Sequence, residues 1–156
     1  MVIRSLRVYA DTSVFGGVFD EEFDTASQTF FQQVQAGQFQ LITPPIVQAE
    51  IESAPEKVRL FFDQMLAIAE LIDVSEQALQ LRKAYLDAGI VTPKSATDAL
   101  HVALATVAGC ALIVSWNFKH IVRFDKVPLY RAVNTLNGYA EIGIYSPLEV
   151  ISNEEE

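Results

Sequence analysis

Short apolar runs alternate along this chain with longer stretches in which apolar residues recur at helical spacing. The runs predict strands at residues 6–10, 39–43, 111–115 and 142–145, and shorter strands at 72–74 and 127–130. Helical patterns are expected at 25–37, 45–51, 55–69, 75–89 and 95–109. Strands that alternate with helices favour an α/β fold, with a mainly parallel central sheet covered by helices on both faces.

The extent of the chain is consistent with one domain of ordinary size. It has 156 residues, of which 51% are hydrophobic, so it has ample material for a core. No internal repeat, low-complexity segment or linker interrupts the pattern. We expect a single domain over residues 1–150, followed by a short charged tail at 151–156.

The first predicted strand stops abruptly at an acidic residue. Leu6 to Ala10 reads as a buried strand, Asp11 follows it, and the next residues, Thr12 to Gly17, are typical of a turn. Asp11 should therefore lie at the carboxyl end of the strand. In open α/β sheets this is the edge at which ligands bind.

A second polar strand end follows the run at 111–115. Asn117 comes directly after it and could lie at the same edge as Asp11, although asparagine is also a common turn residue after any strand. Trp116 and Phe118 flank it. Their aromatic rings could stack on nucleotide bases or pack into the core.

Glu50 lies in the apolar arc of its predicted helix. At about 100° per residue, Ile46, Val47 and Ile51 define that arc, and Glu50 projects between them. An uncompensated buried carboxylate is costly, so a functional role is one explanation. A partly exposed edge position or a buried ion pair is the other.

Asp98 lies near the start of a helix that is apolar almost all round. The spacing Ser95-x-x-Asp98 also fits a capping box, which would explain the acid without any chemistry. His101 follows one turn later on the same side. It is either a second polar group in a cleft or a core histidine bonded to the backbone.

The charge balance limits the possible partners. Lys and Arg total 11 against 20 Asp and Glu, which gives a formal net charge of -9 and a pI of about 4.6. This argues against a general electrostatic grip on phosphates, so any role on nucleic acid must be local or metal-assisted.

Other features favour a cytoplasmic protein without a membrane span. The amino terminus is interrupted by Arg4 and Arg7 and has no signal-peptide pattern. The apolar stretch 99–116 is broken by polar residues and by Gly109, so it is better explained as a buried helix that leads into a buried strand. The single cysteine, Cys110, lies in this stretch, excludes an internal disulfide and is expected to be an inert core thiol.

Four candidate side chains share one kind of chemistry. Asp11, Glu50, Asp98 and Asn117 supply three carboxylates and an amide oxygen, the hard ligands that hold Mg²⁺ or Mn²⁺. No Cys/His spacing supports zinc. A cation would relieve the repulsion among the acids and attract a substrate phosphate to an acidic protein.

Four short motifs together resemble the PIN domain, and the segment S-W-N-F-K-H-I at 115–121 in particular resembles a bacterial branch related to VapC-like toxin ribonucleases. The four motifs are D-T-S at 11–13, P-x-x-x-x-E at 45–50, D-A-L-H at 98–101 and S-W-N at 115–117, and they extend over essentially the whole chain. The resemblance implies a three-layer α/β/α sandwich and a metal-dependent endoribonuclease. It also implies homodimers and, for toxin members, a protein antitoxin.

The resemblance assigns the catalytic and metal-binding carboxylates to Asp11, Glu50 and Asp98. The fourth family position, often Asp, is matched here by Asn117, which loses one negative charge and puts a second metal in doubt; Asp125 is a less well placed substitute. In the mechanism that we expect, Asp11 and Asp98 are metal ligands, and Glu50 is either a ligand or the group that orients and deprotonates the attacking water.

Several further residues are candidates for holding the RNA. Ser13 and Asn117 could hold water or phosphate by hydrogen bonds. The basic residues closest in sequence to the predicted cleft could guide single-stranded RNA or could simply be solvated surface. They are Lys94, Lys119, His120 and Arg123.

Two other functional classes remain open. One is a binding or regulatory module that keeps the fold with weak or no nuclease activity, which the acidic pI and Asn117 favour. The other is an aspartyl-phosphate phosphatase or receiver that uses Asp11. The latter fits less well, because such a phosphatase needs a second Asp where Ser13 stands, and a receiver's acceptor belongs on a middle strand.

Overall fold

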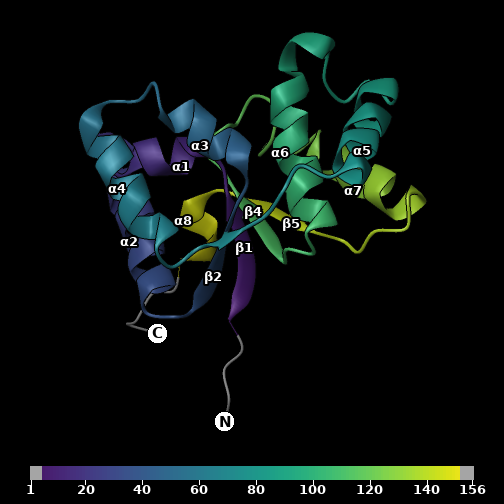
Figure 1. Ribbon diagram of the computed structural model, residues 1–156. Helices are drawn as coiled ribbons and strands as arrows, with labels where there is room; N and C mark the ends of the chain where they lie inside the picture. Colours follow the sequence, from purple (N-terminus) through teal and green to yellow (C-terminus); the bar gives the residue numbers. More distant parts are fainter. Residues whose placement is uncertain (1–4, 152–156) are drawn as a thin grey trace.

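The computed structural model describes residues 5–151 and contains a five-stranded, fully parallel sheet between two layers of helices (Figure 1). The strand order is β3-β2-β1-β4-β5. The strands are β1 (Leu6–Ala10), β2 (Phe39–Thr43), β3 (Glu70–Leu71), β4 (Leu112–Val114) and β5 (Gly143–Tyr145). The predicted α/β/α architecture is therefore confirmed, and the sheet is parallel throughout the described residues.

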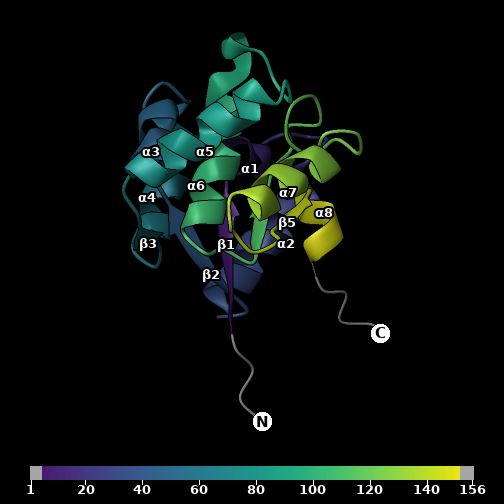
Figure 2. The same cartoon turned by 90° about the vertical axis from the view of Figure 1, so that its right-hand side faces the viewer.

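Helices cover both faces of the sheet. Figure 1 shows α1, α2, α3, α4 and α8 on one side and α5, α6 and α7 on the other, and Figure 2 shows the second layer face on. The helices are α1 (Thr12–Gly17), α2 (Asp24–Gln35), α3 (Pro45–Ile51), α4 (Glu56–Leu66), α5 (Glu76–Asp87), α6 (Ala96–Val107), α7 (Val127–Leu136) and α8 (Pro147–Val150). A 3₁₀ turn, η1 (Pro93–Ser95), leads into α6.

The carboxyl-terminal part of β1 and most of α6 are buried. In β1, Val8, Tyr9 and Ala10 are fully buried, and α6 is buried continuously from Ala99 to Thr106. A strand covered on both faces needs apolar side chains on both, which explains its continuous apolar run. The helix α6 ends at Gly109, whose φ of +73° is a left-handed conformation that glycine adopts without strain.

The sheet has a topological switch point between β1 and β4. From β1, the chain adds β2 and β3 on one side and then returns to add β4 and β5 on the other. In such sheets a crevice forms outside the carboxyl ends of the strands at that point. Asp11 follows β1 and Ser115 follows β4, so both lie at this edge.

One predicted turn and one predicted strand are helices in the structure. The residues after Asp11 form α1, with the Asp11 side chain capping its first turn by accepting from the Ser13 amide. The predicted strand at 127–130 is the start of α7, since Pro128 suits a first helical turn and Tyr130 and Asn134 recur on its buried face. The turn prediction at 12–17 and the strand prediction at 127–130 failed because a short apolar run carries no decisive period.

Smaller differences concern element boundaries. The third strand lies at Glu70–Leu71 rather than 72–74, because its backbone pairs with Ile42 and Thr43 of β2. The short helix α8 was not predicted; a capping box between Ser146 and Glu149 starts it. Most of the predicted charged tail, 152–156, lies outside the described residues. Within 5–151, no helix is long and apolar enough to cross a membrane.

Candidate active site

Asp11 is a buried carboxylate held by serine hydroxyls. Its Oδ1 accepts from the amide of Ser13 at 3.2 Å and from the Ser13 hydroxyl, and its Oδ2 accepts from the Ser115 hydroxyl at 2.6 Å. Only 4% of the residue is exposed. The pKa of Asp11 is raised, first because burial removes its solvation; the hydrogen bonds from Ser115 and Ser13 work against that rise.

The same two serines organise the loop that follows β4. The amide of Trp116 donates to the Ser13 hydroxyl and the amide of Asn117 donates to the Ser115 hydroxyl, both at 2.9 Å. Each hydroxyl thus accepts from a backbone amide and donates to Asp11. Ser13, which we expected to hold water or phosphate, is committed to the Asp11 carboxylate in this structure.

A close approach between α1 and this loop depends on Gly17. A Cβ at that position would lie 2.6 Å from the Ser27 hydroxyl and 2.8 Å from the Trp116 Nε1, closer than such atoms can pack. Trp116 Nε1 donates to Ser27 Oγ at 2.8 Å, and its ring stacks on Phe23 with centroids 4.2 Å apart. Trp116 therefore packs within the protein, whereas Phe118 is half exposed.

Asp98 is joined to Asn117 across the switch point. The Asn117 side-chain amide donates from Nδ2 to Asp98 Oδ1 at 3.1 Å. Its Oδ1 accepts from the backbone amides of Lys119 and His120 at 3.2 and 2.9 Å, which sets the orientation of the amide group. Asn117 therefore presents a donor to Asp98, and its oxygen, predicted as a metal ligand, faces the backbone.

The capping box that would explain Asp98 does not form in the structure. Ser95 is the N-cap of α6 but makes no side-chain capping bond; its hydroxyl lies 3.2 Å from His120 Nε2 instead. Asp98 lies in the first turn of the helix, where the helix dipole favours a negative charge.

Glu50 is an exposed residue at the end of α3, with 41% of its side chain accessible. Its Oε1 lies 2.9 Å from His101 Nε2, and His101 Nδ1 lies 2.7 Å from the Tyr9 hydroxyl. Partial burial tends to raise the pKa of Glu50, but the hydrogen bond from His101 opposes it, and the pKa is lowered. His101 is buried and bonded to side chains on both nitrogens, rather than to the backbone.

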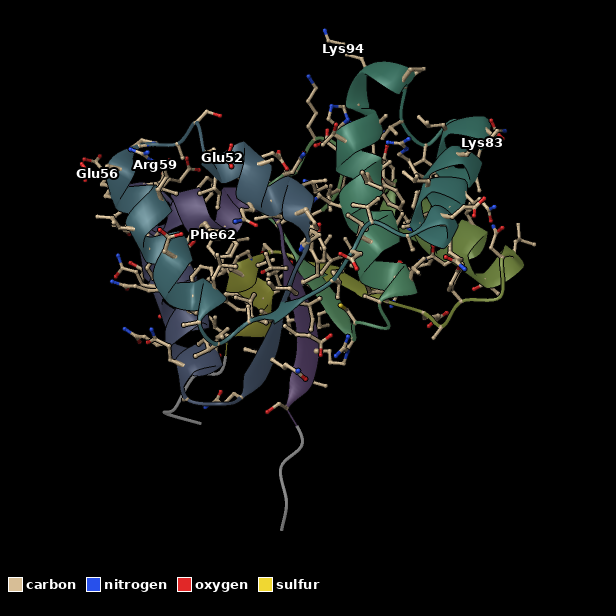
Figure 3. The ribbon with its side chains drawn as sticks, viewed as in Figure 1. Glu52, Glu56, Arg59, Phe62, Lys83 and Lys94 are labelled. Atoms are coloured by element: carbon tan, nitrogen blue, oxygen red, sulfur yellow. The ribbon has the colours of Figure 1, made fainter. Side chains whose placement is uncertain are left out.

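The predicted basic residues lie on two segments, η1 before the start of α6 and the loop after β4. The contact between His120 and Ser95 brings that loop against η1, which carries Lys94. Lys94 and Lys119 are exposed, and Figure 3 shows Lys94 extending away from the fold. Arg123 is paired with Asp125 at 2.8 Å, so the acid considered as a substitute ligand is already engaged.

A separate hollow of about 380 Å³ lies between α3 and α4 and shares no residue with the Asp11 network. Glu52, Glu56, Arg59 and Phe62, labelled in Figure 3, are among its lining residues, together with Asp63. Three carboxylates against one guanidinium make it unsuited to a phosphate backbone.

The donor atoms around Asp11 suit a hard divalent cation held largely by water. Within residues 5–151, no three His, Cys, Asp or Glu side chains are arranged closely enough to enclose a metal ion. However, Asp11 accepts three hydrogen bonds on oxygens that have about four acceptor positions, so one position is left for another ligand. Mg²⁺ is typically bound by one or two carboxylates and several waters, which fits this arrangement.

Sequence reasoning missed two contributors to the site. Ser115 was recognised only as part of a motif, although its place at the end of a predicted strand put it at the same edge as Asp11. Tyr9 was predicted only as a buried strand residue. Its hydroxyl reaches a side chain 92 positions away, a contact for which the sequence has no local signal.

Comparisons with known proteins agree with this architecture. The chain is similar in fold to VapBC2 from Rickettsia felis, solved bound to a DNA fragment from its promoter, with 18% identity, a TM-score of 0.55, and 73% of this chain and 90% of that one covered. It is also similar to a toxin-antitoxin complex from Klebsiella pneumoniae, with 16% identity, a TM-score of 0.57, and 76% and 93% covered.

The family assignment comes from the sequence. No curated protein matches the chain. The family model described as PIN domain matches residues 8–127, which include Asp11, Glu50, Asp98 and Asn117. Since this match spans most of the chain, the chain belongs to the PIN domain family.

Proposed function

We propose that this protein is a metal-dependent endoribonuclease and the toxin of a type II toxin-antitoxin pair. The observation that carries the proposal is Asp11, a buried carboxylate at the switch point of a parallel sheet, with Asp98 and Glu50 on flanking helices. Membership of the PIN family supports it, because PIN domains are generally nucleases that use divalent metal ions.

In this proposal each residue has a distinct role. Asp11 and Asp98 supply carboxylate oxygens to Mg²⁺ or Mn²⁺, and Asn117 orients Asp98 through its amide. The bound ion would supply Lewis-acid activation of the phosphodiester and of water. Glu50, ionised at neutral pH because His101 lowers its pKa, orients the attacking water and accepts its proton.

The basic residues have a guiding role. Lys94, Lys119 and His120 lie around the head of α6 and would attract the RNA backbone locally, despite the net charge of -9. Arg123 would contribute less, because Asp125 already neutralises it.

The test is RNA cleavage by purified protein with Mg²⁺ or Mn²⁺. We expect Asp11→Asn and Asp98→Asn proteins to remain folded and to lose activity by roughly 100- to 1,000-fold, the scale of removing one electrostatic stabiliser. Asp63→Asn, an exposed acid on α4, is the matched control and should cleave like the parent. Cleavage that survives both site substitutions would indicate a contaminating nuclease and contradict the proposal.

A second candidate is a PIN-fold binding or regulatory module with weak or no nuclease activity. Both carboxylate oxygens of Asp11 are engaged by serine hydroxyls, and an asparagine stands at the fourth acidic position. Calorimetric titration with Mn²⁺ separates the two candidates. The nuclease proposal expects binding that is lost in Asp11→Asn, whereas no binding to the intact protein favours the module.

The proposed partners are a protein antitoxin and a second copy of the chain. The structural neighbours are described as VapBC and toxin-antitoxin complexes, which motivates the first. Co-purification with the product of a short adjacent open reading frame tests the antitoxin, and light scattering of the purified chain tests the homodimer. A monomer that retains full cleavage activity would contradict any need for the dimer.

A further inference from the structure

His101 links two parts of the molecule that face each other across the sheet edge. It lies on α6 and is only 3% exposed. One ring nitrogen lies 2.7 Å from the Tyr9 hydroxyl in β1, and the other lies 2.9 Å from the Glu50 carboxylate in α3. Tyr9 is fully buried, so the chain of contacts runs from the core to a half-exposed carboxylate at the site.

The chemistry of the three groups determines the direction of these hydrogen bonds. An ionised carboxylate only accepts, so His101 Nε2 must carry the hydrogen. In a neutral imidazole Nδ1 is then an acceptor, and the Tyr9 hydroxyl donates to it. Both ring nitrogens of His101 and the hydroxyl hydrogen of Tyr9 then have a hydrogen-bond partner. A proton on Nδ1 would leave the buried Tyr9 hydroxyl without its acceptor, which is costly in an apolar core.

We infer that Tyr9 and His101 are positioning residues for Glu50. The Tyr9 hydroxyl holds His101 in the neutral tautomer protonated at Nε2, and that N–H holds the Glu50 carboxylate in one orientation. The consequence for cleavage rests on the proposed nuclease function, whereas the tautomer and the hold on Glu50 can be measured without it.

The physical need for such a device follows from where Glu50 lies. A glutamate side chain at an exposed helix end samples several rotamers, and an ordered rotamer at a reacting group lowers the entropy that must be lost during reaction. His101 is itself immobilised by burial within α6, so it can hold Glu50 still. A hydrogen bond to a backbone carbonyl would have satisfied His101 equally well, without any effect on the site.

The experiment compares Tyr9→Phe with Tyr85→Phe. Both substitutions remove one hydroxyl from a buried tyrosine, but the Tyr85 hydroxyl donates to Asn134 between α5 and α7, outside the site. Nitrogen NMR of labelled imidazoles reports the tautomer, and carbon NMR of labelled carboxylates reports Glu50. In the parent we expect a protonated Nε2 and an unprotonated Nδ1 on His101.

Tyr9→Phe should broaden or mix the His101 tautomers and shift the Glu50 carboxylate resonance, while Tyr85→Phe leaves both unchanged. A parent His101 protonated at Nδ1, or a Glu50 resonance that is the same in both variants, would overturn the inference. These readouts decide it even if the parent cleaves no RNA, an outcome that would refute only the nuclease proposal.

The cleavage assay adds a kinetic test. Tyr9→Phe should lower kcat by about 10-fold with little change in KM, the scale seen when a group that orients a functional side chain is lost. Once Glu50→Gln is present, Tyr9→Phe should have little further effect, because the two act through one carboxylate. An active parent in which Tyr9→Phe and Tyr85→Phe have equal kcat would contradict the positioning role.

Discussion

The charged residues at the two ends of β1 have different surroundings, an ion pair at one end and neutral hydrogen-bond donors at the other. At the amino end, Arg7 makes a two-pronged ion pair with Glu70 at 2.9 and 3.0 Å and also donates to the carbonyl oxygen of Ala108. At the carboxyl end, Asp11 is almost fully buried and accepts hydrogen bonds from two hydroxyls and one amide. It makes no ion pair within residues 5–151.

This difference separates a charge that is paired within the fold from the carboxylate to which we assign a role in the proposed site. Arg7 has a partner of opposite charge and remains partly exposed, so both charges stay solvated or paired. Burial of a carboxylate without a cation costs free energy and raises its pKa. The cost of keeping Asp11 buried at the switch point is the reason why we propose a cation-binding role for it.

Among substitutions outside the proposed catalytic carboxylates, the largest effect is expected from removing a hydrogen bond that holds Asp11. Ser115→Ala removes the donor to Asp11 Oδ2 and the acceptor for the Asn117 amide. We expect metal affinity or cleavage rate to fall by about 10- to 100-fold, as is typical for groups that orient a metal ligand. Ser27→Ala, another buried serine that contacts Trp116, is the control. Equal losses of metal affinity or cleavage rate in the two variants would indicate general destabilisation of the fold instead.

A smaller effect is expected on the free energy of unfolding, which the substitution Asp11→Asn should increase. Most substitutions lower the free energy of unfolding by about 1 kcal/mol, but metal-free Asp11→Asn should raise it at neutral pH because it removes a buried charge. The pKa of Asp11 is higher in the folded state, so the folded protein binds more protons and loses stability as pH rises above the ordinary carboxyl range.

Urea unfolding of the metal-free protein across acidic to neutral pH measures this dependence. The parent should lose stability with rising pH relative to Asp11→Asn, while Asp63→Asn follows the parent. An Asp11→Asn protein that is less stable than the parent at neutral pH would mean that the serine hydrogen bonds outweigh the cost of burial.

The smallest effect is expected at the other end of the strand. Glu70→Gln weakens the pair with Arg7, whose hydrogen bond lowers the pKa of Glu70 despite slight desolvation. That contribution is present above the unfolded pKa of Glu70 and is lost as pH falls through the folded value. We expect a slightly lower Tm at neutral pH and less than about a twofold change in cleavage. A loss of activity comparable to that of Ser115→Ala would remove the contrast between the two ends.

Local patterns were sufficient for most of the fold. The continuous apolar run before Asp11, the proline that starts α3 and the glycine that ends α6 are signals within a few residues, and each led to the observed element. The failures at 12–17 and 127–130 were also local. In both segments, short apolar runs fit a turn or a strand as well as a helix, and only packing against the sheet decides between them.

The sequence by itself determined the parallel α/β architecture and the placing of Asp11, Asp98 and Asn117 at one edge, because periodicity and strand ends are properties of neighbouring residues. Only the tertiary structure decided what these residues touch. Ser115 reaches Asp11 across 104 positions, His101 joins Tyr9 to Glu50, and the amides of Lys119 and His120 turn the Asn117 oxygen away from Asp98. Which atoms form a hydrogen bond depends on differences of about a few tenths of an ångström in the positions of segments that are distant in sequence, and no local pattern encodes those positions.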